Sequence, residues 1–244
     1  MKNPLKLLNK FDIALWCVSV TAVILSFALS SRRDVMSLVS ALVGVSALMF
    51  IVKGHVLGQI LTVIFAAGYG VVSYFFKYYG EMITYLGMSA PAAIAAIISW
   101  LRHPYKQSSQ VAVGTLNIKK AVIVVVLSSA VTAAFYFILK ALGTNNLTVS
   151  TVSVATSMFA SALVFLRSPF YGVAYAANDV VLIVMWVLAS IADISYLPMV
   201  ICFSLFFIYD IYGFISWSKM KRAQSPAEAN SSTEAPETDT IETE

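Results

Sequence analysis

Charged residues are scarce in this sequence. Lys, Arg, Asp and Glu together make up 11% of the 244 residues, 59% of the residues are hydrophobic, and the mean hydropathy is +0.83. A soluble domain could not cover its surface with such a composition. The sequence therefore predicts a polytopic membrane protein whose outer surface contacts the lipid bilayer.

Cysteine and histidine are also rare, with two residues of each. Cys17 and Cys202 lie in separate apolar runs without a CxxC spacing, and His55 and His103 have no second ligand at metal spacing. These patterns disfavour a disulfide framework and a zinc site, and we expect no metal, no cofactor and no catalytic residue. The net charge of +4 does not indicate nucleic-acid binding, because the basic residues form short clusters between apolar runs, as membrane topology requires.

Eight apolar runs have the length that a helix needs to cross about 30 Å of hydrocarbon. The first run has a longer apolar region than a signal peptide and is followed by Arg32 and Arg33, so we expect it to remain as a span. The predicted spans are 12–29, 35–52, 56–76, 82–101, 121–139, 147–166, 169–191 and 194–217.

Basic residues between the spans predict the orientation. With eight spans, 12 of the 16 Lys and Arg residues fall on the side that carries both termini. Basic loops are retained in the cytoplasm, so both termini are predicted to be cytoplasmic. After Lys221 and Arg222 the chain turns polar and acidic without an aromatic residue, and such a segment cannot bury enough surface to fold. We therefore predict a disordered tail.

The sequence contains an internal repeat. Residues 52–58 align with residues 166–172 at an offset of 114, and the fourth and eighth spans share a central proline, Pro91 and Pro198, and an Ile-Ser-Trp ending. The single span 121–139 separates the two groups of three and keeps them in the same orientation. We predict an all-α membrane fold of eight helices arranged as 1 + (3 + 1 + 3), with two parallel three-helix repeats joined by a linker helix. The corresponding segments are 1–34, 35–101, 102–146, 147–218 and the tail 219–244.

This plan, the stretch from Arg167 to Asn178 and the ending DIYGFISW at 210–217 resemble the PnuC family of vitamin transporters, over roughly residues 12–218. The resemblance implies a SWEET-like fold in the inner (plasma) membrane of a bacterium. It also implies uptake of nicotinamide riboside for NAD synthesis, by facilitated diffusion with trapping by phosphorylation inside the cell. Two departures concern the ligand: tyrosines replace the family's tryptophans at the start of the seventh span, and Asp210 stands where many relatives have Asn.

The seventh span carries a polar and aromatic stripe. Tyr171, Tyr175, Asn178, Leu182 and Trp186 are spaced by 4, 3, 4 and 4 residues, which places them on one helical face. Nicotinamide riboside has a flat cationic ring and a carboxamide, which aromatic faces and an amide would recognise. Tyr175, Asn178 and Trp186 are candidate ligand contacts, whereas Tyr171, near the helix start, is better interpreted as a membrane-interface residue.

Two carboxylates lie within apolar spans, where ionisable side chains commonly mark a transport pathway. Asp179 is about 100° around the helix from Asn178 and is therefore expected to point away from the stripe. It would either offset the charge of the pyridinium or pair inside the bundle. Asp210, with Tyr212 nearby, has the same interpretation in the eighth span, and a proton relay through either carboxylate stays open.

Three further polar residues are weaker candidates. Ser153 and Ser157 lie on a hydroxyl face of the sixth span, together with Ser150 and Ser161, which either meets a ribose or allows close helix packing. Gln59 is the polar residue of the third span whose place in the repeat comes closest to that of Asn178, and it lies near the end of its span.

Other functions compete with transport of nicotinamide riboside as interpretations of the sequence. A SWEET-like carrier of another vitamin, nucleoside or sugar would need the carboxylates less. An integral membrane enzyme is disfavoured, because the sequence has no HExxH, no Ser-His pair, no clustered carboxylates and no nucleotide loop. A channel would lack saturable, ligand-specific flux. The expected partners are a small-molecule substrate and the bilayer, and a homo-oligomer stays open.

Overall fold

The structure is a computed structural model that describes residues 4–30, 35–75, 79–106, 108–144 and 146–225. Eight helical segments within this part of the chain are long and apolar enough to cross a membrane, which confirms the predicted number of spans. Six spans are single helices: α1 (Lys10–Leu29), α2 (Val35–Val52), α3 (Val56–Phe75), α6 (Ile118–Ala141), α7 (Leu147–Phe165) and α8 (Tyr171–Ala192).

The fourth and eighth spans are composite. The fourth consists of α4 (Tyr79–Thr84), a π-helical turn η2 (Tyr85–Ser89) and α5 (Ala90–Arg102), and the eighth consists of a 3₁₀ turn η3 (Ile194–Tyr196) and α9 (Leu197–Ala223). Another 3₁₀ turn, η1 (Pro4–Leu7), precedes α1. The prediction of a central proline in both spans holds only for Pro91. Pro198 lies in the first turn of α9, where a backbone N–H would have no partner within the helix, so the proline costs no hydrogen bond.

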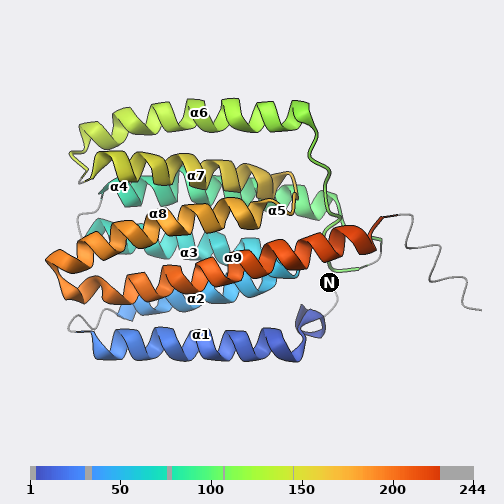
Figure 1. Cartoon of the computed structure of the whole chain (residues 1–244), viewed down its shortest axis with the longest axis horizontal. Helices are drawn as coiled ribbons and strands as arrows, with labels where there is room; N and C mark the ends of the chain where they lie inside the picture. The colour runs from blue at the N-terminus through green and yellow to red at the C-terminus, as the bar shows by residue number, and fades with distance from the viewer. Residues whose placement is uncertain (1–3, 31–34, 76–78, 107, 145, 226–244) are drawn as a thin grey trace, which may run out of the picture.

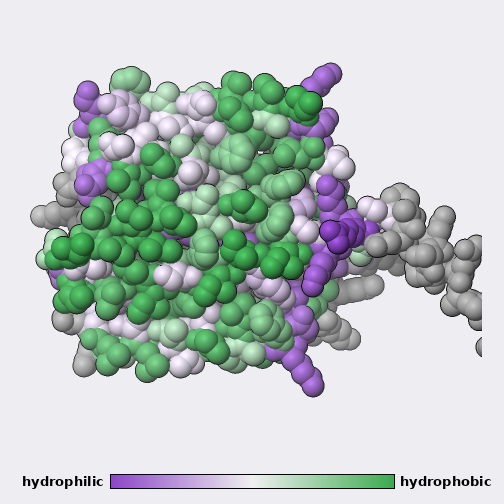
Figure 2. All heavy atoms as spheres, viewed as in Figure 1, coloured by the Kyte–Doolittle hydropathy of each residue, from purple (hydrophilic) through white to green (hydrophobic). Residues whose placement is uncertain are grey.

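The spans lie side by side as one bundle, and the chain enters and leaves it at the same end (Figure 1). The helices α1 and α6 form opposite edges, with α1 packed on α2 and α9, and α6 packed on α7. Figure 2 shows a mostly apolar surface between the two ends, with hydrophilic residues gathered at the end from which the termini emerge. This distribution is that of a multi-pass membrane protein.

Contacts between the two predicted repeats are reciprocal. The first helix of the first repeat, α2, packs on the last helix of the second, α9, and the first helix of the second repeat, α7, packs on the last helix of the first, α5. Within each repeat, successive helices also pack on one another. Each repeat therefore completes the other, and neither forms a separate core.

Four hydrogen bonds connect the two repeats at the terminus-bearing end of the bundle. Trp217 donates its indole N–H to the carbonyl of Ile51 at 2.9 Å, and Ser216 donates its hydroxyl to Val52 at 3.0 Å. In the other direction, Trp100 donates to Val164 at 3.1 Å and Ser99 to Phe165 at 2.7 Å. The last carbonyls of a helix have no hydrogen-bond donor within the helix. The Ser-Trp pair of each repeat donates to such carbonyls at the end of the first helix of the other repeat. We call these four side chains the Ser-Trp interlock.

The linker after α5 crosses the same end. The N–H of Val111 donates to the carbonyl of Gly54, and that of Gly114 donates to the carbonyl of Arg167, both at 2.9 Å. Gly54 and Arg167 have φ angles of +64° and +57° and end α2 and α7 in the same way. The repeat alignment at an offset of 114 pairs Lys53 with Arg167, whereas in the structure Gly54 is equivalent to Arg167, so the alignment is shifted by one residue here.

The helix α9 is longer than predicted. It continues to Ala223, so the first residues assigned to a disordered tail are helical. The side chain of Gln224 holds this end against the linker, accepting from the N–H of Val113 at 2.7 Å and donating to the carbonyl of Val111 at 3.2 Å. The rest of the predicted tail, from residue 226, lies outside the described residues.

Candidate functional site

A cavity of about 100 Å³ lies in the centre of the bundle, between the two repeats. Side chains of α2, α3, η2, α7, α8 and α9 line it. Typical small-molecule sites measure about 300–1,000 Å³, so in this conformation the cavity is smaller than a nucleoside site. Its lining residues are Gly44, Ala47, Leu48, Ile51, Gln59, Thr62, Phe65, Ala66, Tyr85, Ser89, Ser157, Tyr171, Tyr175, Asn178, Asp179, Leu182, Phe203, Phe206 and Asp210.

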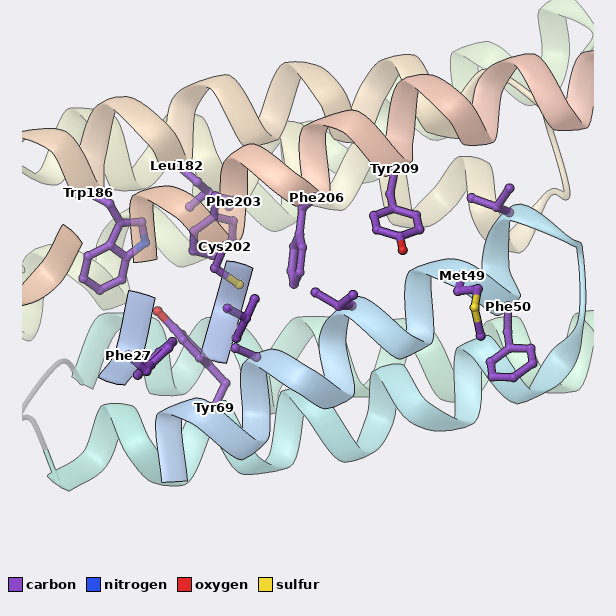
Figure 3. Packing of buried hydrophobic residues seen from close by; sticks show 14 residues of the cluster. Phe27, Met49, Phe50, Tyr69, Leu182, Trp186, Cys202, Phe203, Phe206 and Tyr209 are labelled. Carbon is purple, nitrogen blue, oxygen red and sulfur yellow. The ribbon is translucent and has the colours of Figure 1, made fainter. Parts of the chain in front are cut away.

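One wall of the cavity is aromatic. Phe203 and Phe206 project from α9 toward the helices of the first repeat (Figure 3). The ring of Phe206 meets that of Phe65 edge to face at 5.9 Å, and Phe65 meets Tyr85 in the same way at 5.8 Å. A Cβ atom at position 44 would lie 2.7 Å from Cζ of Phe206, so the glycine there makes room for this ring. These faces suit a flat ring, and a cationic one in particular.

Polar side chains of α8 also line the cavity. The carbonyl oxygen of Asn178 accepts a hydrogen bond from the hydroxyl of Thr156 at 2.9 Å, which orients the amide and leaves its N–H groups for a ligand. The hydroxyls of Tyr175 and Ser161 are 2.8 Å apart and hydrogen-bonded. Both α8 side chains are thus held in place by α7, on which α8 packs.

Asp179 and Asp210 meet at the cavity. They come from α8 and α9, are 3% and 4% exposed, and both line the cavity. The sequence predicts Asp179 about 100° around α8 from Asn178, either beside the pathway or paired inside the bundle, and the structure places both residues at one cavity. The arc of α8 that faces the cavity is wide enough to include both Asn178 and its neighbour, because α3, η2 and α9 surround the cavity on more than one side.

Two of the weaker candidates also line the cavity. Gln59, on α3, is 3% exposed, and Ser157, on α7, faces the same space. The repeat offset placed Gln59 opposite Val173 and did not reveal this position. Together with Tyr175, Asn178, Asp179 and Asp210, six of the nine predicted site residues are brought together here.

Three predicted site residues lie elsewhere. Trp186 packs on Phe203 and Tyr196, and it lines a separate hollow of about 570 Å³ near the end of the bundle opposite the termini. Tyr212 donates its hydroxyl to Asp12 of α1 at 2.7 Å. Ser153 is buried but does not line the cavity. The stripe on α8 is longer than the cavity, so its far end belongs to another environment.

Several lining residues were missed by sequence reasoning. Tyr85 stands in the π-helical turn, with its ring 4.5 Å from that of Tyr69. Turns of this type occur frequently at functional sites, but only Pro91, six residues later, hinted at an irregular helix in the sequence. Tyr171, interpreted as an interface residue, is 1% exposed and lines the cavity.

A larger hollow lies on the outside of the bundle. It measures about 1020 Å³ and lies between α6, α7 and α8, where Phe137 and Val173 are exposed on the outside of the bundle. Its lining is almost wholly apolar, apart from hydroxyls such as that of Thr132. An outer groove of this kind suits lipid chains rather than a polar solute.

Comparison with known proteins gives a consistent result. Residues 34–219 match the family model described as nicotinamide mononucleotide transporter. The chain is 26% identical over 192 residues to the nicotinamide riboside transporter PnuC of Neisseria mucosa, an alignment that covers 77% of this chain and 73% of that protein. The crystal structure of the vitamin B3 transporter PnuC has the same fold, with a TM-score of 0.76 at 23% identity over 89% of this chain and 94% of that one. The chain therefore belongs to the PnuC/nicotinamide mononucleotide transporter family and is a membrane transporter rather than an enzyme.

Proposed function

We propose that this protein takes up nicotinamide riboside by facilitated diffusion, as a supply for NAD synthesis. The observation that carries the proposal is the central cavity, which brings aromatic rings together with an amide and two carboxyl groups. The rings suit the pyridinium, the N–H groups of Asn178 suit the carboxamide oxygen, and the hydroxyl of Ser157 and the amide of Gln59 suit the ribose. The nicotinamide riboside transporter of Neisseria mucosa supports the same ligand class.

Transport through this cavity requires the repeats to move. The cavity is smaller than a nucleoside site in this conformation, so the ligand enters and leaves when the helices around it separate at one end and then at the other. The Ser-Trp interlock holds the terminus-bearing end together, while the hollow beside Trp186 approaches the other end. Phosphorylation inside the cell would trap the ligand and keep the flux inward.

The proposal includes an orientation, with both termini on the cytoplasmic side of a bacterial plasma membrane. The excess of basic residues at the terminus-bearing end supports it. Single cysteines introduced at Lys219 and at Lys140, in a background in which Cys17 and Cys202 are replaced by Ser, would test it in intact cells. An impermeant maleimide should label position 140 and not position 219. A homo-oligomer is compatible with this proposal, because the outer face of α6 is apolar and exposed.

Binding to the purified protein is the direct test. Isothermal titration should show saturable binding of nicotinamide riboside and much weaker binding of its mononucleotide, thiamine, riboflavin, deoxynucleosides and sugars. The variant Asn178→Ala should weaken binding of nicotinamide riboside about tenfold or more, because a buried polar group of the ligand would lose its partner. Tighter binding of another of these compounds, or an unchanged affinity in Asn178→Ala, would overturn the assignment.

A further inference from the structure

We infer that the hollow beside Trp186 is a second ligand site, an outer vestibule that binds the flat cationic ring of the ligand before the ligand enters the central cavity. This inference rests on the proposed function and on its orientation, in which uptake begins at the end of the bundle opposite the termini. It concerns the route into the carrier, whereas the proposed function concerns the central cavity.

The vestibule has the size of a small-molecule site. It measures about 570 Å³, within the range of about 300–1,000 Å³ for such sites, whereas the central cavity measures about 100 Å³. Residues of α4, α7, α8 and η3 line it, together with the loop after α6. Tyr79 and Asn146 at its rim are exposed, while Trp186 at its inner side is 6% exposed. A ligand that arrives from this side therefore meets the vestibule first.

Aromatic rings and a carboxylate come together in the vestibule. The rings are those of Tyr79, Trp186 and Tyr196, and the carboxylate is that of Glu81. The ring centroids of Trp186 and Tyr196 are 5.7 Å apart, with the planes inclined by 42°. Among the described residues, Glu81 forms no ion pair, and no lining residue is Lys, Arg or His. Aromatic faces beside a carboxylate attract a flat cation more strongly than a neutral ring of the same shape.

Trp186 stands between the vestibule and the central cavity. Its ring stacks on that of Phe203, with the centroids 6.5 Å apart and the planes inclined by 10°, and Phe203 lines the central cavity. The ring of Phe206 follows, 5.5 Å from that of Phe203 (Figure 3). These rings form a row that leads from the vestibule to the central cavity. The ring of Trp186 is thus a wall of the vestibule and also the barrier that has to move when the ligand passes inward.

Tryptophan fluorescence can report the vestibule separately from the central cavity. A pyridinium ring quenches the fluorescence of a tryptophan that it contacts, and Trp186 lines the vestibule. The purified full-length protein would be titrated with nicotinamide riboside while its fluorescence is followed, and calorimetry would run in parallel. Nicotinamide methylated on its ring nitrogen and unmodified nicotinamide are the cationic and the neutral probe of the ring alone.

We expect saturable quenching by nicotinamide riboside that is lost in Trp186→Phe. In Asn178→Ala the quenching should keep its concentration dependence, while the calorimetric affinity, which reports the central cavity, falls about tenfold. Glu81→Gln should shift the quenching by both cationic compounds to several-fold higher concentrations and should affect the calorimetric affinity much less. Quenching by neutral nicotinamide should need higher concentrations and should not respond to Glu81→Gln.

Asp193→Asn is the matched control for Glu81→Gln. Asp193 follows α8 at the same end of the bundle but does not line the vestibule. It accepts a hydrogen bond from the N–H of Ser195, which an asparagine can also accept, and the variant should be quenched like the unaltered protein. Tyr79→Leu, at the exposed rim, replaces Glu81→Gln if that variant does not fold, and it should also shift the quenching several-fold.

Uptake by intact cells tests whether the vestibule lies on the route. At low concentrations of nicotinamide riboside the first encounter limits the rate, so Glu81→Gln should raise the KM for uptake several-fold and lower the maximal rate by less. Asp193→Asn should leave both values as they are. An unchanged KM in Glu81→Gln would overturn the inference.

The outcomes separate the inference from the proposed function. Quenching that shifts tenfold in Asn178→Ala would show that Trp186 senses only the central cavity, and quenching that survives in Trp186→Phe would show that the ligand contacts another tryptophan. Either result, or an absence of quenching, would overturn the inference while calorimetric binding upholds the proposed function. If calorimetry shows no binding of nicotinamide riboside, the proposed function fails, and the inference fails with it.

Discussion

The side chains of Trp100 and Trp217 lie against each other with ring centroids 5.3 Å apart, and each donates its indole N–H to a carbonyl of the other repeat. This pair stands at the centre of the Ser-Trp interlock. The two tryptophans close the Ile-Ser-Trp endings that revealed the repeat in the sequence. Their common role explains why the same three residues end both repeats.

The interlock should contribute to stability. Trp217→Phe and Trp100→Phe each remove a buried hydrogen bond between the repeats and leave the carbonyls of Ile51 and Val164 with a backbone N–H donor only, which costs about 1 kcal/mol. Thermal unfolding of the detergent-purified protein should show both variants melting at lower temperature, by similar amounts. Trp16→Phe is a matched control, because Trp16 donates only to the partly buried hydroxyl of Ser46, and its melting temperature should change less. Equal effects in all three would contradict the importance of the interlock.

An ion pair joins the first span to the repeats. Lys53 lies 2.7 Å from the carboxylate of Asp12, with side chains 11% and 2% exposed. Lys53→Met should destabilise the protein by about 3–5 kcal/mol, because it leaves a buried carboxylate unpaired. The double variant Asp12→Asn with Lys53→Met should recover much of this loss. The melting temperatures of the two single variants and the double variant test the pairing, and additive losses would argue against it.

Tyr212 should be dispensable for ligand binding. Its hydroxyl is committed to Asp12, and its ring lies near the ammonium of Lys53, at 5.6 Å from Nζ to the ring centroid. We expect Tyr212→Phe to lower the melting temperature and to leave the affinity for nicotinamide riboside within about twofold. Titration of this variant beside Asn178→Ala separates the two roles. A tenfold loss of affinity in Tyr212→Phe would contradict this prediction and indicate that Tyr212 contributes to ligand binding.

Gly44 should control the space in the cavity. In Gly44→Ala the new methyl group would press on the ring of Phe206, which has to move toward the cavity or displace α9. We expect a several-fold loss of affinity for nicotinamide riboside. Gly87→Ala is the matched control, since a Cβ there has its nearest neighbours at 3.8 Å, and its affinity should not change. If Gly44→Ala leaves the affinity for nicotinamide riboside unchanged, the ring of Phe206 can move without narrowing the cavity, and the prediction is wrong.

His55 should make stability depend on pH. It lies between α2 and α3, is 1% exposed, and accepts a hydrogen bond at Nδ1 from the N–H of Leu57 at 3.1 Å. Burial lowers the pKa of His55 from its usual 6.5. Between the lowered pKa and 6.5 the unfolded chain binds more protons than the folded one, so stability falls as the pH drops through this window. His55→Gln should flatten this part of the curve of melting temperature against pH, and an unchanged slope would assign the dependence to other groups.

Much of the architecture could be predicted from the sequence. Runs such as 35–52 are long enough to cross a bilayer and poor in charge, which determines their helical state and their number, because lipid offers the backbone no other hydrogen-bond partner. The Ile-Ser-Trp endings revealed the repeat. The end of α9 could not be predicted, since the contact of Gln224 with the linker joins residues more than a hundred positions apart.

The site was predictable only in part. The sequence by itself determined that Asn178, Asp179 and Asp210 are polar groups at membrane depth that need partners, and that α8 carries aromatic residues on the same face as Asn178. Only the tertiary structure decided the surroundings: Asp179 and Asp210 line one cavity, Tyr212 turns to α1, and Trp186 packs at the other end. Periodicity describes one helix at a time, whereas a cavity between two repeats depends on how six elements approach one another.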